Sequence, residues 1–286
     1  MSIYNKSGEL LSSAFGNSGA YLSAAYSKSG AQIFPDGPMS LKVMTYNVGG
    51  WYDGKGTNVP AAQDQEYFDL QYGTIHDNDP DFLLLEEYWD QFSKAGRTAL
   101  SFLSELFPYV YSVNGNTKYF GRCFCSKYPL SGYQQRLYAG ENERYYDTII
   151  ANVKGRNIML CVTHLGLTSD VRAPQAQELL AFAQTVQIPI IIAGDFNTAS
   201  SRPDGTDYNN VLLPFLNAGY SLANCGDFGR LITYMDLEYG NGALDNIVCS
   251  DDFTITNVYV DTRKATDELS EHIDHMPLIA TVEFEL

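Results

Sequence analysis

The chain has 286 residues, of which 45% are hydrophobic and 18% are charged, as is typical of a soluble globular protein with a substantial core. No run approaches the roughly 18 apolar residues of a transmembrane helix. The net charge of −16 argues against avid non-specific binding of DNA, because proteins that hold polyanions are normally basic. A phosphate substrate is not excluded, since a bound divalent cation can reverse the local field.

The N-terminus and the cysteines bear on the cellular compartment. Residues 1–6 do not combine a basic region with a following apolar core, so a signal peptide is not expected. The five cysteines, at positions 123, 125, 161, 225 and 249, include no Cys-x-x-Cys pair and lie mostly in apolar, strand-like surroundings. This pattern favours reduced core residues over a disulfide framework or a zinc site. We therefore expect a reducing compartment, such as the cytoplasm.

Residues 1–34 contain a repeat of eleven residues. Each copy begins with an aromatic residue and ends in Ser-Gly: Tyr4 to Gly8, Phe15 to Gly19, and Tyr26 to Gly30. Turn formers dominate, so successive short β-turns or hairpins are predicted. We assign residues 1–40 to an N-terminal arm and linker that packs on the main domain or binds a protein partner. A flexible tail is the alternative.

From residue 41 to 286 the pattern predicts one domain in which strands alternate with helices. Helices are expected over residues 60–76, 90–106 and 172–186. Strands are expected over residues 41–48, 82–87, 109–113, 119–126, 148–153, 157–163, 190–193, 243–249, 253–260 and 278–284. A Tyr- and Gly-rich stretch before residue 243 is expected to be irregular. The natural packing for this order is an α/β arrangement of two or more sheets with helices outside.

Polar side chains stand at the ends of several of these apolar strands. They are Asn47, Glu87, His164, Asp195 with Asn197, Asp245, and the pair Asp274 and His275. Ligands of open α/β sheets collect at the carboxyl ends of strands. A charge that faces a core is costly unless it is paired or metal-bound. The repeated placement therefore predicts a functional site rather than a set of isolated ion pairs.

Asp195 and Asn197 end the most apolar strand, in the sequence Gly-Asp-Phe-Asn. If the chain stays extended, the two side chains alternate around Phe196 and share one face. An Asx turn that closes the strand is the alternative.

Seven short motifs together resemble the endonuclease/exonuclease/phosphatase superfamily, which has the DNase I-like fold. In family order they are Met44 to Val48, Leu85 to Glu87, Gly121 to Leu130, Thr163 to Leu165, Gly194 to Asn197, Leu244 to Ile247, and Asp274 to Leu278. Each motif is short, but the ordered set is specific and spans about residues 41–286. The resemblance implies a four-layer sandwich, with two mixed β-sheets face to face and helices on the outside.

The resemblance also implies a divalent-metal-dependent phosphoesterase, more specifically a phosphodiesterase, that attacks its substrate with an activated water. Asn47 and Glu87 would help to bind the metal, with Asp274 next to it. Carboxylate and amide oxygens suit Mg²⁺ or Mn²⁺.

The remaining site residues would act on the phosphate. Asp195 would orient or deprotonate the attacking water, Asn197 would hold a phosphate oxygen, and His164 would contact the phosphate. Asp245 would orient His275, and a histidine paired with a carboxylate has its imidazolium form favoured.

Three positions depart from the family pattern. Glu86 stands where a glutamine is common, Asn246 where an aromatic residue is frequent, and Ile273 where a serine is usual. They leave the substrate open among nucleic acid, phospholipid head groups and small phosphate metabolites. The rival interpretation is a catalytically idle binding module of the same fold, attached through its N-terminal repeats.

Overall fold

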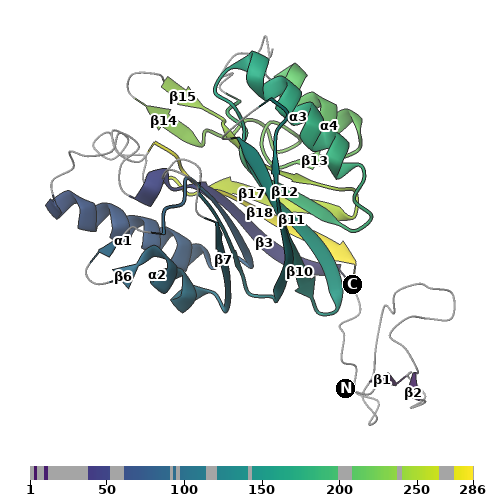
Figure 1. Cartoon of the computed structure of the whole chain (residues 1–286), viewed down its shortest axis with the longest axis horizontal. Coiled ribbons are helices and arrows are strands. Elements are labelled where there is room, and N and C mark those ends of the chain that lie inside the picture. Colours follow the sequence, from purple (N-terminus) through teal and green to yellow (C-terminus); the bar gives the residue numbers. More distant parts are fainter. Residues whose placement is uncertain are drawn as a thin grey trace.

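Two six-stranded mixed sheets lie face to face at the centre of the molecule, as the computed structural model shows (Figure 1). The structure describes residues 3–4, 10–11, 38–51, 61–90, 93–94, 97–113, 121–140, 144–198, 208–236, 240–263 and 274–285.

The first sheet has the strand order β17-β18-β3-β4-β8-β7. These strands are β17 (Phe253–Val260), β18 (Leu278–Glu285), β3 (Pro38–Asn47), β4 (Phe82–Glu86), β8 (Arg122–Ser126) and β7 (Tyr109–Val113). Strands β3 and β4 are parallel, and the other neighbours are antiparallel.

The second sheet has the strand order β13-β16-β12-β11-β10-β9. These strands are β13 (Ser221–Leu222), β16 (Asp245–Cys249), β12 (Ile190–Asp195), β11 (Arg156–His164), β10 (Tyr145–Val153) and β9 (Leu130–Leu137). Only β11 and β12 are parallel among these pairs.

Helices cover the outer face of each sheet. Helices α1 (Ala61–Asn78) and α2 (Ala99–Leu106) pack on the first sheet, where Phe102 joins the cluster around Leu83 and Leu85. Helices α3 (Ser169–Ala183) and α4 (Leu213–Asn217) cover the second sheet together with the π-helical turn η2 (Tyr208–Leu212). The predicted four-layer α/β sandwich is confirmed.

Short elements complete the described chain. They are β1 (Ile3–Tyr4), β2 (Leu10–Leu11), η1 (Gly49–Trp51), β5 (Ser93–Lys94), β6 (Arg97–Thr98), β14 (Tyr234–Asp236) and β15 (Gly240–Gly242). Strands β1 and β2 pair antiparallel, while the rest of the eleven-residue repeats lies outside the described residues. The division at residue 40 stays a prediction.

Alternation along each strand divides its side chains between two cores. In β4, Phe82 and Leu84 pack between the sheets, whereas Leu83 and Leu85 face the helices. Because both faces of β4 are buried, its sequence is an uninterrupted apolar run from Phe82 to Leu85. Glu86 follows Leu84 on the face between the sheets and is itself fully buried.

Several element predictions need correction. The helix expected over residues 90–106 begins only at Ala99, because Thr98 caps it and accepts a hydrogen bond from the Ser101 amide. Strand β9 was not predicted, since it is a largely exposed edge strand with little apolar alternation. Strand β3 begins at Pro38, three residues before the predicted start, and pairs there with Glu285.

The cysteines are free, as predicted, and all five lie in described segments. Four of them are buried in strands. None of the helices in the described part of the chain combines the length and apolarity needed to cross a bilayer.

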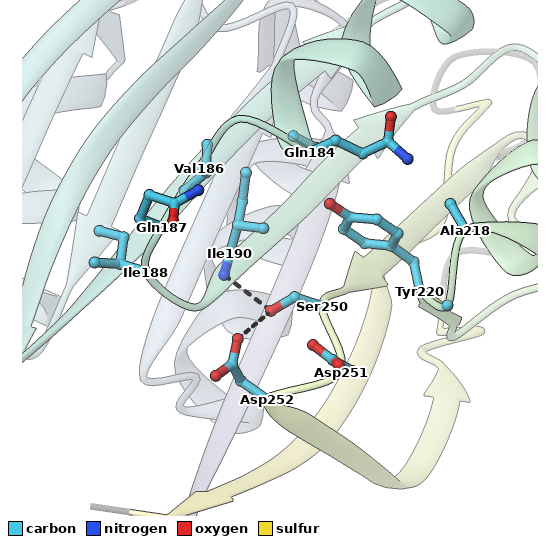
Figure 2. A pocket seen from close by; sticks show the side chains of 12 residues that line it. Gln184, Val186, Gln187, Ile188, Ile190, Ala218, Tyr220, Ser250, Asp251 and Asp252 are labelled. Carbon is cyan, nitrogen blue, oxygen red and sulfur yellow. Dashed lines mark hydrogen bonds between the residues drawn. The ribbon is translucent and has the colours of Figure 1, made fainter. Parts of the chain in front are cut away.

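A pocket of about 480 Å³ opens at the amino end of β12, beside Ile190 (Figure 2). Its polar lining includes Gln184, Tyr220 and Asp251. Asp195 lies at the other end of the same strand, roughly 17 Å away by strand geometry. The pocket is therefore separate from the polar strand ends.

Gly194 permits the close approach of β11 and β12. A Cβ atom at this position would lie 1.9 Å from the carbonyl oxygen of Thr163, and the residue has a φ of +149°. We expect Gly194→Ala to lower the free energy of unfolding by about 1–3 kcal/mol, measured by urea denaturation. Gly73→Ala in α1 is the matched control, because a Cβ there meets nothing within 4 Å and should leave stability unchanged or slightly raised. Equal stability of the two variants would contradict this account.

Candidate active site

The core between the sheets becomes polar at one end of the sandwich. Along each central strand, the alternation that places apolar residues between the sheets continues into a polar residue at this end. In β4, β11 and β12 the polar residue follows the last apolar one, as in Leu84 and Glu86, Val162 and His164, and Ala193 and Asp195. In β16, which runs antiparallel to β12, the polar Asp245 precedes the apolar Ile247. Strand register makes the three polar residues of the second sheet neighbours, because Asp195 pairs with both His164 and Asp245.

Asp195 lies at the centre of the polar group. Its Oδ2 is 3.2 Å from Asn47 Nδ2, and 3.5 Å from Nε2 of both His164 and His275. These partners come from three different segments: β3, β11, and the turn before β18. Asp195 is 2% exposed.

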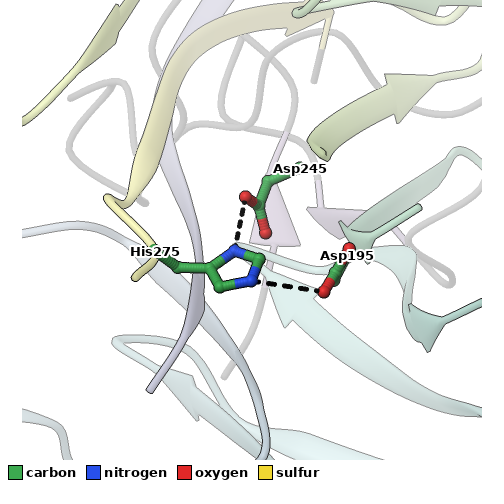
Figure 3. A group of neighbouring side chains, drawn as sticks. All are labelled: Asp195, Asp245 and His275. Atoms are coloured by element: carbon green, nitrogen blue, oxygen red, sulfur yellow. Dashed lines mark hydrogen bonds and ion pairs between the residues drawn. The ribbon is translucent and has the colours of Figure 1, made fainter. Parts of the chain in front are cut away.

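His275 lies between two carboxylates (Figure 3). Its Nδ1 is 2.9 Å from Oδ2 of Asp245, and its Nε2 faces Asp195. Burial by itself lowers the pKa of His275, but the charges of Asp245 and Asp195 outweigh it and hold the pKa well above its usual value. The imidazolium form is therefore favoured at neutral pH.

His164 has the opposite protonation tendency. Burial holds its pKa well below the usual value, and the nearby positive charges of Arg144 and Arg122 lower it further. Arg144 also donates from Nη1 to the His164 carbonyl oxygen at 3.2 Å. One neutral and one protonated histidine thus contact the same oxygen of Asp195.

Asn197 does not share a strand face with Asp195 as the extended-chain interpretation required. It has a left-handed φ of +51°, and its backbone N–H donates to Asp195 Oδ1 at 2.8 Å, which closes an Asx turn. Its Nδ2 donates to the Leu165 carbonyl oxygen at 2.8 Å. The turn therefore links the ends of β11 and β12, and one N–H of the amide group remains for another acceptor.

Glu87 also has a left-handed backbone, with a φ of +51° directly after β4. Its Oε1 accepts from Asn47 Nδ2 at 3.1 Å. Burial raises the pKa of Glu87 to about 7, and the charges of Asp274 and Asp195 add to the rise, while the hydrogen bond from Asn47 opposes it.

The donor set fits a hard divalent cation beside Glu87. Three carboxylates, those of Glu87, Asp274 and Asp195, repel one another there, and a cation would relieve that repulsion. The Nδ2 group of Asn47 donates to the carboxylates of Glu87 and Asp195, and its oxygen accepts from the Gly49 N–H. In this orientation Asn47 fixes the Glu87 carboxylate.

A second group of potential ligand atoms is formed by Asp195, Asp245 and His275, which lie within 4.8 Å of one another. It fits a cation less well, because both ring nitrogens of His275 already face carboxylates and the imidazolium has no lone pair to offer. The Glu87 side is the better candidate.

The sequence motifs did not identify two residues before β16 that contact Asp245 and His275. The Thr233 hydroxyl accepts from the Asp245 N–H at 3.0 Å, and the ring of Tyr234 meets that of His275 edge to face at 5.1 Å. Asn246, which replaces a frequent aromatic, donates from Nδ2 to the Asn224 carbonyl oxygen at 2.7 Å. No periodic pattern in the sequence marks Thr233 or Tyr234.

Comparisons with known proteins agree with the architecture. Residues 44–272 match the sequence model of the Endonuclease/Exonuclease/phosphatase family. Among curated proteins, no significant match is found. An endonuclease/exonuclease/phosphatase from Beutenbergia cavernae is similar in structure, with a TM-score of 0.60 and 15% identity, over 86% of this chain and 72% of that one.

Two further solved structures share the fold. Truncated TDP2 from Caenorhabditis elegans has a TM-score of 0.59 and 17% identity, over 85% of this chain and 97% of that one. ANGEL2, described as a 2′,3′-cyclic phosphatase, has a TM-score of 0.62 and 15% identity, over 87% of this chain and 97% of that one.

Proposed function

Because this chain belongs to the endonuclease/exonuclease/phosphatase family, we propose that it is a divalent-metal-dependent phosphodiesterase. At the level of the family, it is a hydrolase of phosphate esters. The observation that carries the finer proposal is the carboxylate of Asp195, which two histidines of opposite protonation tendency and one asparagine contact from separate segments. Such an arrangement can hold a water and a phosphate together.

In this proposal, Asp195 orients the attacking water and accepts its proton. His275, kept protonated by Asp245, donates to a phosphate oxygen and stabilises the negative charge that develops in the transition state. The neutral His164 and the remaining amide N–H of Asn197 are further donors to the phosphate. General acid–base help of this kind contributes about 10²–10⁴-fold to the rate.

Glu87 would hold the metal, with Asp274 beside it and Asn47 fixing the Glu87 carboxylate. When bound, Mg²⁺ or Mn²⁺ would offset negative charge on the phosphate and on the leaving oxygen.

The test of the function is hydrolysis of bis-p-nitrophenyl phosphate with Mg²⁺ or Mn²⁺, and its inhibition by EDTA. A second panel separates the substrate classes: plasmid DNA, RNA, adenosine 2′,3′-cyclic phosphate, sphingomyelin and inositol phosphates. The acidic chain favours substrates other than long duplex DNA. Failure with every ester and both metals would reject the proposal in favour of an idle binding module.

Glu87→Gln should weaken metal binding, because it removes one charge from the proposed ligand set but keeps the side-chain size. We expect the Mg²⁺ concentration for half-maximal activity to rise about tenfold. Calorimetric titration with Mn²⁺ should show the same loss without relying on turnover. Glu283→Gln on β18 is the control, since it lies near the far end of the sheet beside Ser40. Unchanged Mn²⁺ affinity in Glu87→Gln would contradict the assignment.

A further inference from the structure

The turn η1, which follows β3, has an unusual backbone. Its three residues, Gly49, Gly50 and Trp51, all have a left-handed φ, of +54°, +71° and +81°. Glycine adopts this conformation freely, whereas the Cβ atom of a bulky residue makes it unfavourable for tryptophan. A strained residue of this kind persists only where its surroundings hold it, and such residues concentrate at functional sites. The contacts of Trp51 should therefore show what the strain maintains.

The side chain of Trp51 is fixed in the core behind the first sheet. It is fully buried, and its ring meets those of Phe102 and Tyr88 edge to face, with 4.8 and 5.9 Å between ring centroids. Phe102 belongs to α2, and Tyr88 directly follows Glu87 in the chain. The Trp51 N–H donates to the Val48 carbonyl oxygen at 2.8 Å, which closes the turn. The packed indole thus holds the backbone of Trp51 in its strained conformation.

The two glycine amides of η1 hold the metal side of the candidate site. The Gly50 N–H donates to the Glu87 carbonyl oxygen at 2.9 Å and so fixes the backbone of this left-handed residue. The Gly49 N–H donates to Asn47 Oδ1 at 3.1 Å, which leaves Nδ2 of Asn47 directed at the carboxylates of Glu87 and Asp195. Because a change in φ or ψ rotates the neighbouring peptide planes, a relaxed turn would direct these N–H groups elsewhere.

We propose that Trp51 is a positioning residue, whose buried indole holds η1 in the conformation that fixes Asn47 and Glu87. The indole acts through the backbone of the turn and touches neither metal nor substrate. The consequence for metal binding and turnover rests on the proposed function, whereas the order of the turn itself can be measured without metal or substrate.

The first arm of the experiment is hydrogen exchange of the metal-free protein, measured by mass spectrometry on peptides that cover η1. Trp51→Leu removes the aromatic ring and should make the Gly49 and Gly50 amides exchange about tenfold faster, because the turn then opens more readily. Trp51→Phe, whose ring fills part of the space, should give an intermediate increase. Phe284→Leu is the matched control. It also removes a buried aromatic ring, but it lies near the far end of β18, opposite Met39, and should leave exchange of the turn unchanged.

The second arm measures the site itself, well below the unfolding midpoints of all variants. Calorimetric titration should show an about tenfold loss of Mn²⁺ affinity in Trp51→Leu and no loss in Phe284→Leu. In hydrolysis of bis-p-nitrophenyl phosphate at saturating metal, kcat of Trp51→Leu should fall about tenfold, with KM within about threefold of the parent, because a buried indole does not touch substrate. Trp51→Phe should restore kcat and Mn²⁺ affinity to within a few-fold.

Each outcome decides the proposal. Parental exchange in Trp51→Leu, or equally fast exchange in Phe284→Leu, would overturn it. Faster exchange with parental Mn²⁺ affinity and kcat, or a kinetic loss confined to KM, would leave Trp51 as a core residue without a positioning role. Should Trp51→Leu fail to fold, Trp51→Phe decides alone, and parental exchange in that variant would reject the proposal. If the parent binds no Mn²⁺ and hydrolyses no ester, the proposed function fails, but the exchange arm still decides whether Trp51 holds the turn.

Discussion

Asp195→Ala should lower the rate of bis-p-nitrophenyl phosphate hydrolysis at least ~10²-fold without unfolding the protein. The reason is that three nitrogen atoms from separate segments lie within 3.5 Å of its Oδ2, so the side chain has no substitute in the site. The measurement is kcat/KM, with circular dichroism and thermal unfolding to show that the fold persists.

Asp195→Asn is the isosteric companion, since it keeps the side-chain size and can still accept from the Asn197 N–H but lacks the charge. It should be as inactive as the alanine variant. Asp251→Ala, in the exposed turn after β16, should retain parental activity. Near-parental rates in Asp195→Ala or Asp195→Asn would remove Asp195 from the proposed mechanism.

His275→Ala should also lower hydrolysis at least ~10²-fold, because it removes the donor that Asp245 keeps protonated. The pH dependence gives a sharper test through Asp245→Asn. Loss of the Asp245 charge lowers the pKa of His275, so the alkaline limb of the kcat profile should move to lower pH. An alkaline limb that stays in place would contradict the Asp245–His275 pairing in catalysis.

The same pair predicts the sign of the change in stability with pH. The pKa of His275 in the folded state lies above its unfolded value of about 6.5. Its contribution to stability is therefore fully present below about pH 6.5 and is lost as the pH rises through the folded-state pKa. The advantage in thermal midpoint of the parent over Asp245→Asn should consequently be larger near neutral pH than at high pH, because burial raises the pKa of the Asp245 carboxyl itself to about 6 and this carboxylate loses its partner when His275 is deprotonated.

The sequence was most informative where a strand is buried on both faces. Runs such as the one before Asp195 can only be central strands, so their polar ends mark one edge of a sheet. The sequence could not indicate which alternate positions face the space between the sheets, and so Arg122 and Asp147 escaped notice. Each of these two charged residues lies in a strand whose pattern otherwise predicts an ordinary core strand.

Local backbone geometry was the second feature that could not be fully predicted from the sequence. Residues other than glycine and asparagine rarely adopt a left-handed conformation, so nothing in the sequence indicated it for Glu87, whereas the Asx turn at Asn197 was one of two expected alternatives. Strand β9 escaped because an edge strand exposed along most of its length needs no apolar face. Tertiary pairing decides such segments, and pairing is not a local property of the sequence.

The pairing of β3 with β18 has a practical consequence for immobilising the protein. Pro38 lies opposite Glu285, so both ends of the described sandwich meet at one extremity of the first sheet (Figure 1). Asn47 stands nine residues further along β3, roughly 30 Å away by strand geometry. A surface linker or fusion partner attached at either end of the sandwich would therefore leave the opposite extremity open to large substrates.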